Sequence, residues 1–522
     1  MLLSLIAVVC GPGGLGSATA GASPAPTVDG AGWTVYHHDP AGRGVAAGVT
    51  SVTAGSRAWT SPVLDGSLYG EPLVFGGTVY VATENDVVYA LAASSGAVVW
   101  SRHLGPAVPA SVLPCGDITP TVGITGTPVI DPSRGELYVV ADELIAGSPS
   151  HRLVGLSLTT GAIEMSQAVD PAGASPASLL QRTGLTLDGG RIVLTFGGNY
   201  GDCGTYRGWV VAVGETGGTP LEYAVDAARG ESQGAVWMGG GAPAVDAEGD
   251  LWVSTGNGSV TSTAKPYDDS DSVLELSPSL GLEQFFAPAN WASNNAADLD
   301  LSTVPALLTD GQVVAAGKTR LAYLLDGAHL GGIGGQVATV GPVCGDDVDG
   351  GSTTVDTTVY LPCLDGIVAL RVGAAPPSLR VVWSSRTGGG PPILAGGLVW
   401  TISQAGVLYG LDPATGAVRQ QALVGKPANH FPTPSAGDGI LMATSSDQVV
   451  AFATSSDLPA AAPGAGPTTG HRAPGGPGRP PSVVTGSGGV TILLVLAGVA
   501  GGLLVTVAVG SVELRRRSRR RG

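Results

Sequence analysis

Residues Val79 to Trp100 read VYVATENDVVYALAASSGAVVW and contain the pattern that decides the fold. Short apolar strands alternate with tight turns: one strand ends in Ala-Leu, a Ser-Gly turn follows, and the unit closes with a tryptophan. An antiparallel unit of this kind cannot bury its own hydrophobic face. Repeated units must therefore stack against one another, so the repeat determines the fold.

The same pattern returns along the chain in stronger and weaker copies. The eight copies span residues 79–100, 137–164, 191–218, 250–277, 313–326, 359–383, 398–419 and 439–452. The last copy lacks its final strand. The N-terminal segment Ser56 to Ser61 contains Trp59 and belongs to no other copy, so we expect it to complete the last unit and close a ring.

This pattern resembles the pyrroloquinoline-quinone-type (PQQ-type) repeat of eight-bladed β-propellers, over roughly residues 33–454. The family includes quinoprotein alcohol dehydrogenases and non-enzymatic scaffold propellers, so the resemblance implies a fold and leaves the function to the site. The composition agrees, because 83 glycines, 38 prolines and 13% charged residues fit many short strands joined by turns. We expect an all-β, eight-bladed propeller whose N-terminal strand closes the last blade.

Both ends of the chain have the features of targeting segments. Residues 1–20 have the pattern of a secretory signal peptide, and residues 455–489 form a Pro/Gly/Ala-rich stalk. Residues 490–512 are 23 residues without a charge, enough for a transmembrane helix across the ~30 Å hydrocarbon core. The arginine-rich tail, 513–522, favours the cytoplasmic side. We therefore expect a single-pass cell-membrane protein whose propeller, residues 33–454, is an extracellular ectodomain.

Four cysteines lie in this predicted ectodomain, and three pairings are possible. Cys344 with Cys363 is our first choice because the two are close in sequence and flank one strand pair. That choice leaves Cys115 to pair with Cys203. The formal net charge of −16 argues against nucleic acid as a partner. The expected partners are a protein or a cell-wall ligand on the propeller loops, and the membrane through the C-terminal helix.

Four residues in the middle of the chain match functional positions of the quinoprotein dehydrogenases. The resemblance implies that Asp202, shortly before an Arg-Gly pair, and Asn257, in Thr-Gly-Asn, bind calcium. It implies that Asp300 is the catalytic base and that Lys318 reaches the quinone oxygens of the cofactor, pyrroloquinoline quinone. In such enzymes calcium polarises the quinone, the base takes the alcohol proton, and hydride passes to the quinone.

Two departures from the family argue against this chemistry. The dehydrogenases hold their cofactor between a tryptophan and a disulfide of adjacent cysteines, whereas Cys115 has no neighbouring cysteine. The expected tryptophan position, near residues 242–244, has no aromatic residue, and Trp237 is on the other side of the glycines. A simpler interpretation of Asn257 is a residue of a tight turn, and the aspartates fit loop carboxylates.

The sequence therefore favours a binding or assembly scaffold at the cell surface. The alternatives are a calcium- and pyrroloquinoline-quinone-dependent alcohol or sugar dehydrogenase, and a degenerate site that binds a cation or small ligand without chemistry. Geometry separates these hypotheses. If Asp202, Asn257, Asp300 and Lys318 face one funnel, the ligand-binding alternatives gain, and if they scatter, the scaffold remains.

Overall fold

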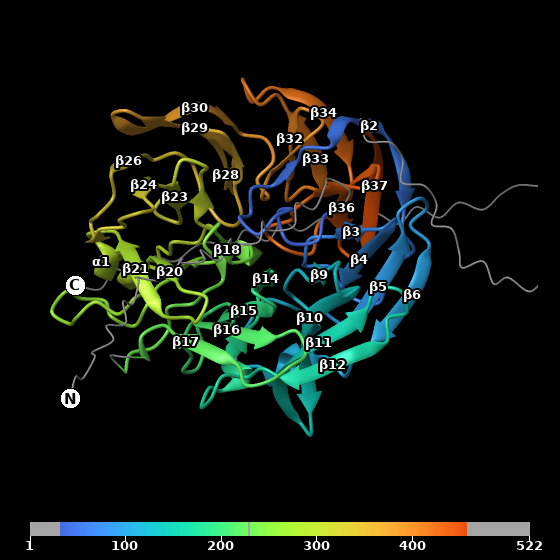
Figure 1. The fold of residues 1–522 in the computed structure, drawn as a ribbon, viewed down its shortest axis with the longest axis horizontal. Helices are drawn as coiled ribbons and strands as arrows, with labels where there is room; N and C mark the ends of the chain where they lie inside the picture. The colour runs from blue at the N-terminus through green and yellow to red at the C-terminus, as the bar shows by residue number, and fades with distance from the viewer. Residues whose placement is uncertain (1–31, 228–229, 457–522) are drawn as a thin grey trace, which may run out of the picture. The chain divides into compact units, whose positions relative to one another are not determined.

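The computed structural model describes residues 32–227 and 230–456. These residues form eight mainly antiparallel sheets of four or five strands around a ring, with a short β7–β8 ribbon beside them (Figure 1). Each sheet contains one of the eight sequence copies, in chain order. The predicted all-β, eight-bladed propeller is confirmed.

In the first four blades, the early strands lie toward the axis and the last strands toward the rim (Figure 1). Blade 1 consists of β3 (Leu73–Phe75), β4 (Thr78–Ala82), β5 (Val87–Ala92) and β6 (Val98–His103), and blade 2 of β9 (Val129–Asp131), β10 (Glu136–Ile145), β11 (Ser148–Ser157) and β12 (Ile163–Ala168). Blade 3 consists of β13 (Leu179–Leu180), β14 (Thr186–Asp188), β15 (Arg191–Gly198), β16 (Trp209–Gly214) and β17 (Leu221–Ala224). Blade 4 consists of β18 (Ala244–Val245), β19 (Leu251–Ser254), β20 (Val273–Leu276) and β21 (Leu282–Ala287), with β25 (Gly332–Ile333) at its edge.

The other four blades follow the same order. Blade 5 consists of β22 (Ala306–Leu307), β23 (Gln312–Ala316), β24 (Ala322–Asp326) and β26 (Ala338–Val340), and blade 6 of β27 (Thr353–Val355), β28 (Thr358–Cys363), β29 (Gly366–Ala374) and β30 (Pro377–Ser385). Blade 7 consists of β31 (Ile393–Ala395), β32 (Leu398–Ile402), β33 (Val407–Leu411) and β34 (Val418–Leu423), with β1 (Val45–Ala46) at its edge. Blade 8 consists of β35 (Ser435–Gly437), β36 (Ile440–Ser445), β37 (Gln448–Ser456) and β2 (Val49–Thr60). The remaining elements are β7 (Val108–Pro109), β8 (Thr121–Val122), α1 (Trp291–Ala297) and the 3-10 turns η1 (Ala110–Val112), η2 (Pro176–Ser178) and η4 (Met238–Gly240).

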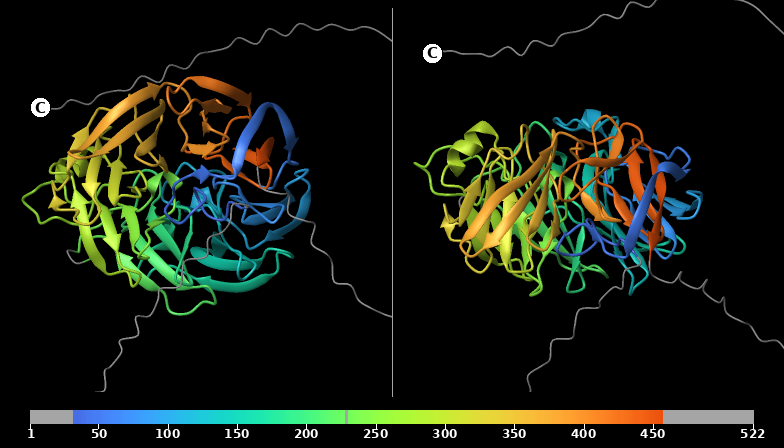
Figure 2. Two further views of the ribbon diagram at one scale, coloured as in Figure 1. Left: turned by 45° about the horizontal axis from the view of Figure 1, so that its top comes forward. Right: turned by 90° about the horizontal axis from the view of Figure 1, so that it is seen from above.

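The N-terminal strand closes the ring, as the sequence predicted. β2 runs antiparallel to β37, with Trp59 opposite Ala451 and Val49 opposite Ser456. Figure 2 shows β2 in blue beside β37 in orange-red. The strand begins earlier than the predicted Ser56, at Val49. Two segments about 390 residues apart in sequence therefore build one blade, and neither can form it alone.

In three pairs of neighbouring blades, the tryptophan of one blade packs against the turn glycine of the next. Each indole N–H donates to a backbone carbonyl across the blade boundary, and the ring packs on the glycine; the sets are Trp59 with Ala93 and Gly96, Trp100 with Leu158 and Gly161, and Trp383 with Pro413 and Gly416. A Cβ on any of these glycines would lie under 3.0 Å from the ring. This contact explains why Ser/Thr-Gly and Trp recur together in the repeat.

Both predicted disulfides form, Cys115–Cys203 and Cys344–Cys363. The signal peptide, the transmembrane helix, the cytoplasmic tail and nearly all of the stalk lie outside the described residues. Among the residues that the structure describes, none of the helices has the length and apolarity that a membrane span requires.

Candidate functional site

A cavity of about 390 Å³ opens where the blades converge. Its walls come from loops spread around the whole ring, from Tyr69 to Phe431. Because a propeller brings such distant loops together only near its axis, this pocket lies at one end of the central channel. Its polar and aromatic lining includes Tyr69, Asp117, Arg182, Asn199, Tyr200, Asp202, Trp237, Asn257, Asp298, Asp300, Lys318, Asp349, Asn429, His430 and Phe431.

The pocket brings together all four residues singled out in the sequence: Asp202, Asn257, Asp300 and Lys318. They come from three consecutive blades and from the connections between them. The four residues therefore face one funnel rather than scattering. Their roles as calcium ligands, base and cofactor contact stay predictions.

Asp300 is the centre of a buried hydrogen-bond network. Its Oδ1 accepts the backbone N–H of Asn257 at 2.6 Å, and its Oδ2 accepts the indole N–H of Trp237 at 3.2 Å. Lys318 Nζ lies 2.8 Å from the same Oδ2. Burial raises the pKa of Asp300, and the Lys318 charge opposes that shift. Lys318 therefore favours the ionised form of a carboxylate that burial alone would tend to protonate.

The backbone around Asp300 places this ion pair. α1 ends at Ala297, and Asp298 takes a left-handed conformation, φ 56°, that turns the chain back toward the axis. Lys318 donates its backbone N–H to the Asp300 carbonyl at 2.9 Å. A Cβ on Gly317 would lie under 3.0 Å from that carbonyl oxygen, so only glycine permits the approach. Lys318 also contacts Asp298 at 2.9 Å. Burial lowers the pKa of Lys318, but Asp300 and Asp298 together raise it above its ordinary value.

The two predicted calcium ligands occupy the same pocket with different exposure. Asp202 is exposed, has φ 54° and accepts the Tyr206 hydroxyl at 2.5 Å. Asn257 is buried, and its backbone carbonyl accepts the N–H of Gly234. Among the described residues, no set of three mutually close acidic ligands forms in this pocket. A calcium ion there would need oxygens from Asp202, from Asn257 and from the bound ligand itself.

Trp237 corrects one expectation from the sequence. Residues 242–244 are not aromatic, which predicts a pocket without a tryptophan, yet Trp237 itself lines the pocket. The tight turn η4 follows it, closed by the N–H of Gly240 bonding to the Trp237 carbonyl, and this reversal leaves Trp237 on the pocket side. Its ring centroid lies 5.8 Å from that of Phe431 and 5.4 Å from Lys318 Nζ.

Arg182 and its aromatic neighbours form a part of the pocket that no sequence motif indicates. The Arg182 guanidinium lies 5.7 Å from the ring centroid of Tyr69 and 5.6 Å from that of Phe431. Burial lowers its pKa from the ordinary value. These three residues belong to different loops far apart in sequence, and none is part of a recognisable motif, so no signal in the chain links them.

A disulfide lies directly behind one wall of the pocket. Gly201 lines the pocket, and a Cβ at this position would lie 3.4 Å from the sulfur of Cys115. The bridge from Cys115 to Cys203 spans 88 residues, so it is not the adjacent-cysteine disulfide of the dehydrogenases. It pins the segment that contains Asp202 to the loop after blade 1.

The lining is acidic overall. Asp117, Asp202, Asp298, Asp300 and Asp349 outnumber the two permanent cations, Arg182 and Lys318. Burial raises the pKa of Asp349 to about 7. A ligand rich in carboxylates would therefore enter this pocket favourably only with a cation beside it.

A family model described as outer membrane protein assembly factor BamB matches residues 42–268. The structure is an eight-bladed propeller, and this match to a PQQ-repeat model covers a little under half of the chain. Solved structures with the same fold include two quinohemoprotein alcohol dehydrogenases. ADHIIG of Pseudomonas putida HK5 is 15% identical with a TM-score of 0.59, covering 84% of this chain and 82% of that chain. The enzyme of Comamonas testosteroni is 16% identical with a TM-score of 0.58, covering 83% and 82%.

A third similar structure is BamB from Moraxella catarrhalis. It is 15% identical to this chain, with a TM-score of 0.51, covering 76% of this chain and 99% of that chain. A sequence search among curated proteins gives no match. At these identities the likeness to solved structures shows a shared propeller, and function rests on the pocket.

Proposed function

We propose that this propeller binds a small polar ligand in its axial pocket, and that the ligand is a quinone cofactor of the pyrroloquinoline-quinone class held together with calcium. One observation carries the proposal. One cavity is lined by all four residues that the sequence resemblance singles out, namely Asp202, Asn257, Asp300 and Lys318. Trp237 adds the aromatic surface that residues 242–244 do not supply.

The pocket residues divide into holding and reacting groups. Asp202 and Asn257 supply oxygens for calcium, and Arg182 and Lys318 supply positive charge for ligand oxygens. A bound quinone supplies the two-electron oxidation of an alcohol or sugar hydroxyl. Asp300, whose ionised form Lys318 favours, accepts the hydroxyl proton. Because the lining is acidic, we expect binding of an anionic quinone to require calcium.

The test is a titration of the full-length chain with pyrroloquinoline quinone, with calcium and with a chelator, read by tryptophan emission and thermal stability. We expect saturable binding only with calcium, weakened at least about tenfold in Asn257→Ala. Asn290→Ala is the matched control, because Asn290 is exposed and lies outside the pocket. Lack of saturable binding with calcium present would contradict the cofactor proposal.

The second candidate is the scaffold at the outer face of the cell membrane, anchored through residues 490–512. The match of residues 42–268 to the assembly-factor family favours it. In that function the loops around the ring bind a protein or wall polymer, and the pocket is secondary. Cross-linking in intact cells followed by mass spectrometry tests it, with cross-links expected on one loop face of the ring. Cross-links distributed evenly over both faces and the rim would contradict a specific docking surface.

A further inference from the structure

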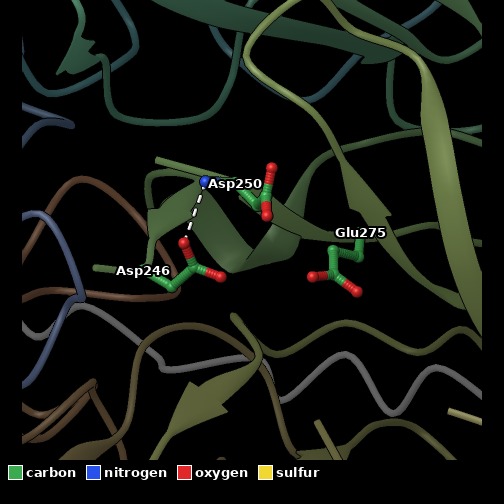
Figure 3. Close-up of side chains that lie close together, drawn as sticks. All are labelled: Asp246, Asp250 and Glu275. Carbon is green, nitrogen blue, oxygen red and sulfur yellow. Dashed lines mark hydrogen bonds between the residues drawn. The ribbon is translucent and has the colours of Figure 1, made fainter. Parts of the chain in front are cut away.

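Three carboxylates meet in blade 4 (Figure 3). Asp246 follows β18, Asp250 precedes β19, and Glu275 lies on β20. One oxygen from each lies within 4.8 Å of the other two. The pocket residue Asn257 follows the other end of β19. The cluster is therefore separate from the axial pocket, and none of its three residues lines that cavity.

Asp246 is held rigidly while one of its oxygens keeps free capacity. Its Oδ1 accepts the backbone N–H groups of Glu248 and Asp250, at 3.0 and 2.9 Å. Its Oδ2 accepts the indole N–H of Trp252 at 2.8 Å. A carboxylate oxygen has two lone pairs, so Oδ2 can still bind one more partner. The turn thus presents a fixed oxygen toward the other two carboxylates (Figure 3).

Glu275 is the observation that points to a ligand. Glu275 is only 9% exposed, and its Oε2 has no hydrogen-bond partner. It stands opposite Trp252 in the β19–β20 register, on the same side as Asp246 and Asp250 (Figure 3). A buried carboxylate oxygen without a partner is costly to keep. A cation bound by the three carboxylates would remove that cost.

No side-chain cation of the described residues neutralises the cluster. None of the ion pairs found in residues 32–227 and 230–456 involves Asp246, Asp250 or Glu275. Arg191, from blade 3, donates to the carbonyl of Pro278. Burial raises the pKa of Glu275, a hydrogen bond from Gln284 opposes this, and Asp250 raises it further. The three carboxylates therefore repel one another in the absence of a metal ion.

We propose that Asp246, Asp250 and Glu275 bind a calcium ion that ties the β18–β19 turn to β20. Calcium takes oxygen ligands at roughly 2.3–2.6 Å, so two of its ligands can stand up to about 5 Å apart. The three oxygens lie within 4.8 Å of one another, which is close enough for one calcium ion to contact all three after small side-chain adjustments. Magnesium demands near-ideal octahedral geometry and gives up its water reluctantly, so the more flexible coordination of calcium suits these three carboxylates better. Water molecules complete the coordination from the exposed side.

Trp252 supplies a built-in reporter for the experiment. Terbium occupies calcium sites, and its emission is sensitised by a nearby excited tryptophan. Because Trp252 donates to Asp246 and pairs with Glu275, we expect strong sensitised emission from terbium added to the full-length chain. Calcium should displace terbium and abolish that emission. Trp252→Phe should remove most of the emission while calcium still raises the thermal stability.

Glu275→Gln is the decisive variant because it separates a calcium site from a carboxylate cluster that binds no metal. Only a calcium site predicts that the substitution removes the stabilisation by calcium. In a chelator, the variant should be at least as stable as the wild type, since one repelling charge is gone. With calcium, the wild type should gain stability and the variant should gain little, with affinity at least about tenfold weaker. Because a calcium ion in the axial pocket would also need oxygens from the bound quinone, Asn257→Ala should retain the full terbium signal when no quinone is present.

Two results would overturn the proposal. One is equal calcium stabilisation of Glu275→Gln and the wild type. The other is terbium emission that is lost in Asn257→Ala and kept in Glu275→Gln, because the ion would then occupy the axial pocket. Since neither variant removes an apolar core side chain, both should fold, and each measurement decides for or against the site.

Discussion

At the scale of single residues, a glycine and a tryptophan from different repeats act as one unit. Gly161 has φ +64° and a Cβ there would lie 2.6 Å from Trp100. Gly135 has nearly the same backbone, φ +67°, but open space around it. Substituting each glycine in turn therefore separates the strain of a left-handed backbone, which both positions share, from the loss of the inter-blade contact, which only Gly161 makes.

We predict that Gly161→Ala destabilises the propeller by about 3 kcal/mol, and Gly135→Ala by about 1 kcal/mol. Both variants pay for the left-handed conformation, and only Gly161→Ala displaces an indole. Chemical denaturation followed by circular dichroism measures the difference. Equal losses would mean that the tryptophan contact adds nothing beyond the backbone requirement.

The buried pair of Asp300 and Lys318 gives a second prediction at this scale. Lys318→Met should cost about 3–5 kcal/mol of folding free energy, because it leaves Asp300 buried without its cation. Adding Asp300→Asn should recover part of the loss in a double-mutant cycle. Asp298→Asn serves as control, since its side chain is 62% exposed and should change stability by under about 1 kcal/mol. Additive single-variant effects would contradict the coupling.

At the scale of elements, ring closure depends on one strand. β2 completes the last blade and its Trp59 locks that blade to the first. Trp383 makes the same contacts between blades 6 and 7, but all four strands of its own blade are consecutive in the chain. The two tryptophans thus differ chiefly in whether their strand is the closing one.

We predict that Trp59→Ala and Trp383→Ala each cost about 3–5 kcal/mol. Only Trp59→Ala should speed hydrogen exchange along β37 and at the first blade, because the ring opens at its seam. Trp383→Ala should speed exchange locally, in blades 6 and 7. If exchange at β37 rises equally in both variants, β2 has no special closing role.

At the scale of the whole molecule, buried carboxyl groups set the response to pH. Burial raises the pKa of Asp86 to about 10, of Asp226 to about 9 and of Asp271 to about 8. Neither oxygen of Asp86 or Asp226 has a hydrogen-bond partner. At neutral pH these groups keep their protons in the folded state and lose them on unfolding, so the folded state binds more protons.

Stability should therefore fall as pH rises from about 5 to about 8, by up to about 1.4 kcal/mol per pH unit for each such group. Thermal unfolding in matched ionic strength measures this slope. Asp86→Asn should flatten it and stabilise the protein at the alkaline end. A stability that rises over the same interval would contradict the raised pKa values.

The sequence by itself determined the architecture. Strand length, turn glycines and closing tryptophans are local signals, and stacking is the way such units bury their apolar faces. Those signals predicted eight blades and the closing role of the segment around Trp59, and the spacing of the cysteines predicted both disulfides. The resemblance also located four residues of the pocket, because their motifs, such as Thr-Gly-Asn257, are short and contiguous.

Only the tertiary structure decided what surrounds those four residues. Trp237 turns into the pocket because η4 reverses the chain after it, and Arg182 meets Tyr69 and Phe431 because ring closure joins loops some 360 residues apart. The carboxylate cluster around Glu275 likewise requires three strands in register. A one-dimensional pattern records which face of a strand is apolar. It does not record which loops meet at the axis or which side chains share an edge.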